Sequence, residues 1–235
     1  MSEDISNLAN PNWEVEWKNF VFKAAAPDNY QDILDSMREN FYKDEPLNIF
    51  TGYSEGKRKD LDRMITELFK DGLSCIVVEK ETGKVAGAQI SILCRRGEED
   101  RIPEMECPQM KQILPFLELL DEKGKVFDHY PELDCYAELF MISIEKEFRG
   151  CGLACKSYQL VADILKVRGV KLLKSSFTNP YTQRIATKLG YRELARVYNR
   201  DYKDKNGEMV WPHVEDDYPD YSAIVGVLEI DCEQN

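Results

Sequence analysis

The chain has 235 residues, and its 31 Lys and Arg against 43 Asp and Glu leave a net charge of −12. A surface that binds nucleic acid replaces counterions with clustered Lys and Arg, and the sequence shows no such basic stripe. The composition therefore argues against nucleic acid as a partner. The hydrophobic fraction of 43% is that of a globular protein, and the length permits a large core without disulfides, so we expect one domain over residues 1–235.

The seven cysteines are odd in number and form no C-x-x-C pair. The acidic start, residues 1–16, has neither the cationic nor the apolar segment of a secretion signal. No apolar run reaches the roughly 18 residues that a membrane span needs. These features predict reduced thiols and a soluble, cytoplasmic protein without a membrane partner, and we expect a monomer.

The sequence has only two histidines, His129 and His213. Each lies in a turn-like segment beside a proline, without a ligand or nucleophile partner at a recognisable spacing. Zinc sites and Ser-His-Asp triads depend on such partners. We therefore expect no metal and no triad-type hydrolase.

Strands and helices are predicted to mix in the first half of the chain. Apolar residues at a period near 3.6 indicate helices, and runs rich in β-branched and aromatic residues indicate strands. Pro46 disfavours the helical conformation at Glu45 and so predicts a break there. The expected elements are a strand over 15–24, helices over 27–41 and 57–70, a hairpin of strands 74–80 and 84–93, a loop over 95–108, and a helix near 109–120.

The second half begins with the run that is most typical of a strand, residues 135–144. The remaining expected elements are a helix from the 149–154 turn to about 168, a strand over 170–175, a helix over 181–189, and strands over 192–199 and 222–230. An early hairpin, a central strand-turn-helix unit and an antiparallel finish predict an α/β fold. Its mixed sheet would carry helices on both faces.

The turn before the central helix reads R-x-x-G-x-A from Arg149 to Ala154. Its glycines allow a ligand to approach the backbone, and the free amides and dipole of the helix start favour an anion such as a pyrophosphate. A glycine-rich turn is also a common packing solution, and that alternative stays open. The same stretch, from Gly150 to Ser157, reads G-x-x-x-x-C-K-S and approaches a nucleotide-binding P-loop. It lacks the glycine before the lysine, and Asp121 ends a predicted helix rather than a strand.

The sequence resembles the GNAT acetyltransferases, and specifically the insect arylalkylamine N-acetyltransferase family. The motifs that carry the resemblance are F-Y-K-D-E-P-L-N at 41–48, R-G-C-G-L-A at 149–154, T-N-P-Y-T-Q at 178–183 and K-L-G-Y at 188–191. They occur in the order and spacing of that family and cover nearly the whole chain. The resemblance implies a central mixed sheet that is splayed, with a cleft that takes acetyl-CoA between two parallel strands.

The resemblance also implies a set of site residues. Backbone amides of the turn would hold the CoA pyrophosphate, and the preceding strand would pair with the pantetheine arm. One amide of that strand would face the thioester carbonyl, where attack builds an oxyanion. The implied cofactor-binding residues are Ile142, Ile144, Arg149, Gly150, Cys151, Gly152, Leu153 and Ala154.

Glu45 of the D-E-P-L-N segment is the general base that the resemblance implies, acting through water. A base is needed because a primary alkylamine is mostly protonated near pH 7, with a pKa of about 10.4 for lysine. Thr178 and Thr182 stand where better-known relatives have serines, with Tyr181 between them. A hydroxyl there could return a proton to the CoA thiolate. The alternative is that Tyr181 and Thr182 cap and pack a helix start.

The expected activity is acetyl transfer to the primary amine of a small acceptor, by direct attack while both substrates are bound. Arylalkylamines such as dopamine, tyramine or serotonin, and agmatine or polyamines, all suit the resemblance. Aromatic residues near Glu45, including Phe41 and Tyr42, could hold a ring or could belong to the core. The alternatives from other classes are a CoA-binding protein without activity on small amines, and a protein lysine acetyltransferase.

Overall fold

The computed structural model describes residues 6–53, 59–98 and 105–232. Within them, one eight-stranded sheet has the order β1-β2-β3-β4-β5-β6-β8-β7. β5 and β6 are parallel, and the other neighbouring strands are antiparallel, so the predicted mixed sheet is confirmed. The strands are β1 Glu14–Trp17, β2 Phe20–Ala24, β3 Cys75–Glu79, β4 Val85–Arg95, β5 Cys135–Ile144, β6 Leu172–Phe177, β7 Arg192–Tyr198 and β8 Ser222–Glu229.

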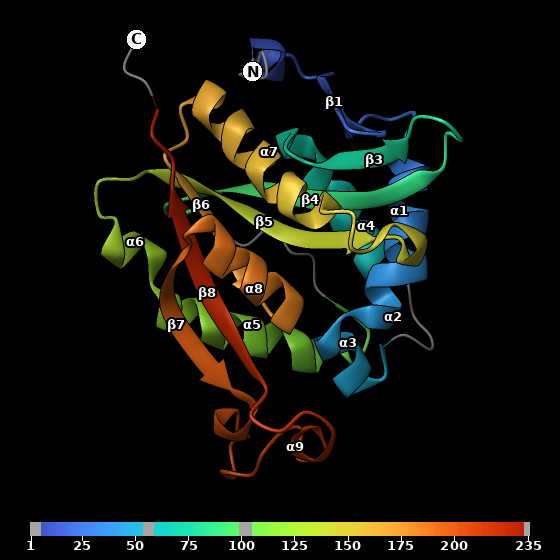
Figure 1. Cartoon of the computed structure of the whole chain (residues 1–235). Coiled ribbons are helices and arrows are strands. Elements are labelled where there is room, and N and C mark those ends of the chain that lie inside the picture. Colours follow the sequence, from blue (N-terminus) through green and yellow to red (C-terminus); the bar gives the residue numbers. More distant parts are fainter. Residues whose placement is uncertain (1–5, 54–58, 99–104, 233–235) are drawn as a thin grey trace.

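Helices cover both faces of this sheet, as predicted (Figure 1). One face carries α1 (Tyr30–Ser36), α4 (Lys59–Leu68) and α5 (Met110–Gly124), and the other carries α7 (Leu153–Arg168) and α8 (Pro180–Leu189). Each face has its own apolar cluster, because the alternating side chains of the strands point to opposite sides. The short helices are α2 Tyr42–Asp44, α3 Pro46–Thr51, α6 Val126–His129 and α9 Val214–Asp217.

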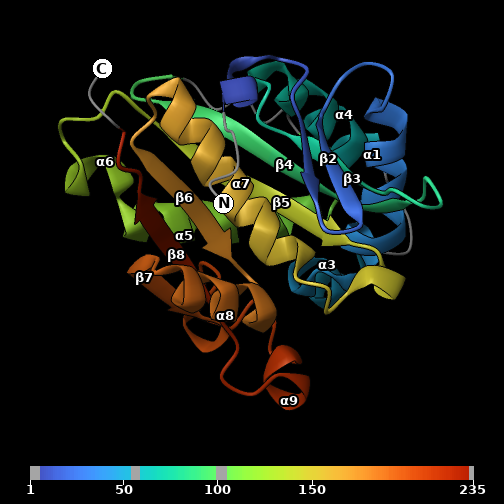
Figure 2. The same ribbon diagram turned by 45° about the horizontal axis from the view of Figure 1, so that its top comes forward.

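The prediction of a single first strand over 15–24 is wrong. The segment is a tight hairpin in which Trp17 pairs with Phe20, and Lys18 turns the chain with a φ of 54°. Strand-forming residues flank the turn closely on both sides, and the sequence lacks the Asn-Gly or Asp-Gly pair that usually marks such a turn. Figure 2 shows this hairpin beside β3 at one end of the sheet.

The predicted helix over 27–41 consists of α1 followed by a π-helical stretch, Met37–Phe41, and the single turn α2. The predicted break at Glu45 is confirmed: its ψ is 125°, and Pro46 begins α3. Proline suits the first position of a helix because the amide it lacks has no partner there. The Glu45 carboxylate therefore lies between two short helices.

The sheet opens between β5 and β6. The two strands pair only at Ala137 with Leu173 and at Glu138 with Lys174, although β5 continues to Ile144. Beyond that point β4 and β5 diverge from β6, β8 and β7 (Figure 1). Within the described residues, no helix has both the length and the apolar character needed to cross a membrane.

Candidate active site

A cavity of about 130 Å³ lies where the sheet opens. Its walls come from both faces of the sheet and from both diverging strands. The side chains of α3, α4, α5 and β5 are largely apolar, and β6, α7 and α8 add several of the polar groups. The lining residues are Phe41, Glu45, Leu47, Asn48, Leu61, Met64, Met110, Ile113, Leu114, Leu117, Asp121, Glu138, Leu139, Phe140, Met141, Ile142, Tyr158, Ser175, Ser176, Thr178, Asn179 and Thr182.

Glu45 is the central ionisable group of this cavity. Burial raises the pKa of its carboxyl to about 7, while hydrogen bonds from the Thr178 hydroxyl and the Leu47 backbone amide lower it. Thr178 Oγ1 donates to Glu45 Oε1 at 2.6 Å. A carboxyl with a pKa near neutrality exchanges protons readily at physiological pH, which is a property of general bases.

Thr178, which follows β6, is itself held by the residue before the neighbouring strand β8. The Tyr221 hydroxyl donates to the Thr178 carbonyl at 2.7 Å, and Tyr221 is buried. On the other side, Asn179 caps α8, because its Oδ1 accepts a 2.8 Å hydrogen bond from the Tyr181 amide. These bonds fix the backbone on both sides of the hydroxyl that contacts Glu45.

The structure brings Thr182 to the cavity but not Tyr181. Thr182 Oγ1 donates to the Asn179 carbonyl at 2.9 Å in the first turn of α8, and Thr182 lines the cavity. Tyr181 is 72% exposed and lies against the Arg184 guanidinium on the outer side of the helix. Consecutive helical residues point about 100° apart, which separates the two side chains.

β5 carries a bulge at the cavity. Ile90 and Ser91 of β4 pair with Met141 and Leu139, so Phe140 is the extra residue. A bulge re-aims backbone groups and is common beside active sites. Ile142 lines the cavity, whereas Ile144 belongs to the apolar cluster under α7, outside the lining.

The 149–154 turn leads from the end of β5 into α7. Gly150 and Gly152 have φ of 83° and 90°, a region that disfavours other residues, and Leu153 begins the helix. The turn therefore presents free amides of a helix start, as an anion site requires. Cys151 is exposed, Leu153 is buried, and Ala154 is partly buried in the first turn.

The Arg149 side chain points toward the Glu45 segment. Its guanidinium donates to the Ile144 carbonyl at 3.0 Å and to Asp44 at 2.5 Å. The ion pair joins the 149–154 turn to the residue before Glu45. A P-loop lysine must reach the phosphates, but Lys156 is only 6% exposed, and Asp121 lies on α5 rather than at a strand end. The P-loop alternative is therefore not supported.

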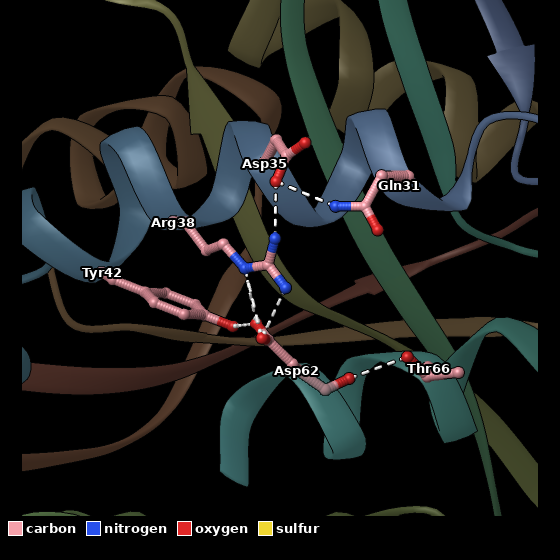
Figure 3. A network of polar contacts seen from close by, with 6 residues as sticks. All are labelled: Gln31, Asp35, Arg38, Tyr42, Asp62 and Thr66. Carbon is pink, nitrogen blue, oxygen red and sulfur yellow. Dashed lines mark hydrogen bonds and ion pairs between the residues drawn. The ribbon is translucent and has the colours of Figure 1, made fainter. Parts of the chain in front are cut away.

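A charge network holds the segment that precedes Glu45 (Figure 3). Arg38 contacts Asp62 with a 2.6 Å ion pair, and the Tyr42 hydroxyl donates to the same carboxylate at 2.9 Å. The network ties the π-helical stretch and α2 to α4, and the cavity residues Phe41 and Leu61 each adjoin a member of the network in the sequence.

Sequence reasoning missed two polar groups: Lys174, which contacts two carboxylates of the cavity lining, and Tyr158, which lines the cavity itself. Lys174 is 1% exposed and pairs with Glu138 at 2.6 Å and with Asp121 at 2.7 Å, directly where β5 and β6 part. Tyr158 is buried, and its hydroxyl lies 3.5 Å from Ser175 Oγ. Burial raises the pKa of Tyr158, so its phenol stays protonated. Neither group has a sequence signal, because its partners lie on other elements.

No family model matches the sequence. Solved structures do match over nearly its whole length. Arylalkylamine N-acetyltransferase 2 from Aedes aegypti has 23% identity and a TM-score of 0.80, covering 91% of this chain and 100% of its own. A mosquito arylalkylamine N-acetyltransferase like 5b has 20% identity and a TM-score of 0.79, covering 89% and 99%. The polyamine N-acetyltransferase of Drosophila melanogaster, which forms N-acetylagmatine, has 17% identity and a TM-score of 0.74, covering 89% and 99%.

The open mixed sheet and these matches define a GNAT fold. Insect arylalkylamine and polyamine N-acetyltransferases are among the structures that share this fold with the chain. The fold expected from the sequence motifs is therefore confirmed. Among the described residues, no group of three or more His, Cys, Asp or Glu side chains is placed to hold a metal ion.

Proposed function

We propose that the protein is an acetyl-CoA-dependent N-acetyltransferase that acts on a small primary amine. The observation that carries the proposal is Glu45: a partly buried carboxyl with a pKa of about 7, bonded to Thr178, in a cavity at the opening between β5 and β6. The similarity to structures of amine acetyltransferases supports the same reading.

Glu45 supplies the first chemical requirement. An ammonium group has no lone pair, so the acceptor must lose a proton before it attacks, and the Glu45 carboxylate accepts that proton, directly or through water. The free amine then attacks the thioester carbon. A new C–N bond forms, and the carbonyl oxygen becomes an oxyanion.

Two further steps complete the transfer. A backbone amide near the Phe140 bulge stabilises the oxyanion, since a fixed donor costs no reorganisation during the reaction. Collapse of the intermediate breaks the C–S bond, and the thiolate takes a proton from a hydroxyl of the cavity. The attacking nitrogen loses its second proton, which restores that hydroxyl through water, and Glu45 returns its own proton to solvent. Thr178, Thr182 and the protonated Tyr158 are the candidates for that hydroxyl, each lining the cavity. Tyr181 stays only a sequence prediction.

The chain offers a place for acetyl-CoA that fits its chemistry. The pyrophosphate would accept hydrogen bonds from the amides of the Arg149–Ala154 turn, where Gly150 leaves open space above the backbone. The pantetheine arm would lie along β5 beyond Glu138, where β6 no longer pairs with β5. Coenzyme A supplies an activated acetyl group, and the chain's residues bind and orient it.

The apolar wall of the cavity favours an acceptor amine with an apolar body. The residues that α4 and α5 direct into the cavity are Leu61, Met64, Met110, Ile113, Leu114 and Leu117. The two further carboxylates of the cavity, Glu138 and Asp121, already contact the Lys174 ammonium. An arylalkylamine therefore suits the cavity better than a polyamine, which needs several free anionic partners.

A thiol-release assay tests the proposal. Acetyl-CoA is supplied with tyramine, dopamine, serotonin, agmatine, spermidine or a histone peptide, and coenzyme A binding is measured separately by calorimetry. We expect release with the arylalkylamines above all others. Release with the peptide alone would establish a protein acetyltransferase, and binding without release would establish an inactive CoA-binding protein; either result overturns the proposal.

A further inference from the structure

The tip of the N-terminal hairpin lies against the turn that begins α7. Trp17 pairs with Phe20, so Lys18 and Asn19 form the two-residue turn between β1 and β2. A β-carbon added at Gly152 would lie 3.3 Å from the Trp17 ring. The hairpin therefore packs on the anion-site turn, although the two segments are far apart in the sequence.

Lys18 places its ammonium group at this junction. Its Nζ donates to the Cys151 carbonyl at 3.5 Å and lies 4.2 Å from the centroid of the Trp17 ring. The ring face attracts the cation and holds it beside the turn. Lys18 is exposed, and an ammonium has three donors, so the group can bind an additional acceptor without leaving the ring.

The other cations that border the turn are already engaged. Arg149 pairs with Asp44 at 2.5 Å, Lys146 with the same carboxylate at 3.8 Å, and Lys84 with Glu147 at 3.3 Å. Lys18 forms no ion pair with any carboxylate in the part of the chain that the structure describes. It is thus a full positive charge beside an anion site, in a protein of net charge −12.

We propose that Lys18 is a phosphate-binding residue of the coenzyme A site, held in place by Trp17. The inference rests on the proposed function, since it assigns the anion at the α7 turn to coenzyme A. That ligand carries a pyrophosphate and a 3′-phosphate, whereas a helix start supplies only about half a positive charge. Lys18 adds a whole charge, so the N-terminal hairpin belongs to the binding site as well as to the sheet.

Calorimetric titration of coenzyme A into Lys18→Asn and Lys18→Arg tests the proposal. Asparagine tolerates the left-handed conformation of the turn, so this variant removes the charge without straining the fold. We expect the Kd to rise about fivefold for Lys18→Asn, the effect of one partly exposed ion pair, and to change little for Lys18→Arg. The loss should shrink at high salt, because ions screen exposed charges.

Lys23→Asn is the matched control. Lys23 lies on β2 of the same hairpin, and it pairs with Glu14 at 3.4 Å. Its removal lowers the net positive charge of the hairpin equally, so a general charge effect would weaken binding in both variants. We expect wild-type affinity for Lys23→Asn.

Titration with 3′-dephospho-CoA identifies the phosphate that Lys18 binds. If it is the 3′-phosphate, Lys18→Asn and wild type bind this analogue equally; if it is the pyrophosphate, the fivefold difference remains. Wild-type affinity of folded Lys18→Asn for coenzyme A itself would overturn the inference. A wild-type protein that binds no coenzyme A would instead overturn the proposed function, so the two failures are distinguishable.

Discussion

The Thr178 hydroxyl donates a 2.6 Å hydrogen bond to Glu45, and this bond connects the residue after β6 with the break between α2 and α3. It opposes the effect of burial on the carboxyl: burial raises the pKa of Glu45, and the hydrogen bond lowers it. The balance lies at about 7. The reactivity of Glu45 therefore depends on a contact between two segments that are distant in the sequence.

Replacing Glu45 with glutamine should remove the proton acceptor and keep its shape. We expect kcat/KM for the amine, at saturating acetyl-CoA, to fall by about 10² to 10⁴, the usual contribution of a positioned general base. Coenzyme A affinity, measured by calorimetry, should not change. A variant with the wild-type rate would show that Glu45 is a buried structural carboxyl and that the base lies elsewhere.

The pH dependence of kcat/KM for the amine, which reports groups of the free enzyme, should depend on the Thr178–Glu45 bond. Activity should rise as Glu45 ionises, with a midpoint near pH 7. Thr178→Val removes a donor that lowers the pKa of Glu45, so its midpoint should move to higher pH. Thr178→Ser retains the hydroxyl and should keep the wild-type midpoint. Equal midpoints in the valine and serine variants would contradict this role.

Glu45 should also make stability depend on pH. The folded protein keeps the Glu45 proton up to about pH 7, whereas the ordinary carboxyl value is 4.5. Between these values the native state binds more protons than the unfolded state, so the contribution of Glu45 to the free energy of unfolding falls as pH rises. Urea denaturation at pH 4.5 and at pH 7 measures the free energy of unfolding of wild type and Glu45→Gln. We expect the value for wild type to fall relative to that of the variant between these two pH values. A constant difference would mean that the pKa is not raised.

Removing one partner of the ion pair between Lys174 and Glu138 should destabilise the protein more than replacing both partners with apolar residues. Lys174→Met leaves the buried Glu138 carboxylate beside Asp121 without its cation, which should cost about 3–5 kcal/mol. The double variant Lys174→Met, Glu138→Leu removes both buried charges and should recover most of that loss. Chemical denaturation of wild type, Lys174→Met, Glu138→Leu and the double variant measures these differences. An additive double variant would show that the charges do not interact.

We expect no cysteine to carry the acetyl group. Burial raises the pKa of Cys75 and of Cys94 to about 12, so both thiols stay protonated. Cys151 is exposed beside the start of α7, so it is the cysteine at which a covalent intermediate would be sought. Incubation with radiolabelled acetyl-CoA without amine should leave the protein unlabelled. Stoichiometric label on Cys151 would replace direct transfer with a covalent intermediate.

Several features of the site are determined locally, and the sequence by itself was enough to predict them. Pro46 restricts the backbone of the residue before it, so the break at Glu45 follows from sterics alone. Gly150 and Gly152 are free to adopt positive φ, and their position between a strand and a helix predicts a glycine turn that leads into a helix start. Each of these features depends on neighbours in the chain, which a motif records directly.

Only the tertiary structure decided which distant groups meet. Whether Thr178 contacts Glu45, whether Lys174 opposes Glu138, and whether Lys18 reaches the α7 turn all depend on the strand order and on where β5 and β6 part. The rotation of α8 likewise turned Tyr181 outward while Thr182 faces the cavity. The physical reason is that these contacts arise from packing between elements, and the burial that raises the pKa of Glu45 exists only once the faces of the sheet are covered.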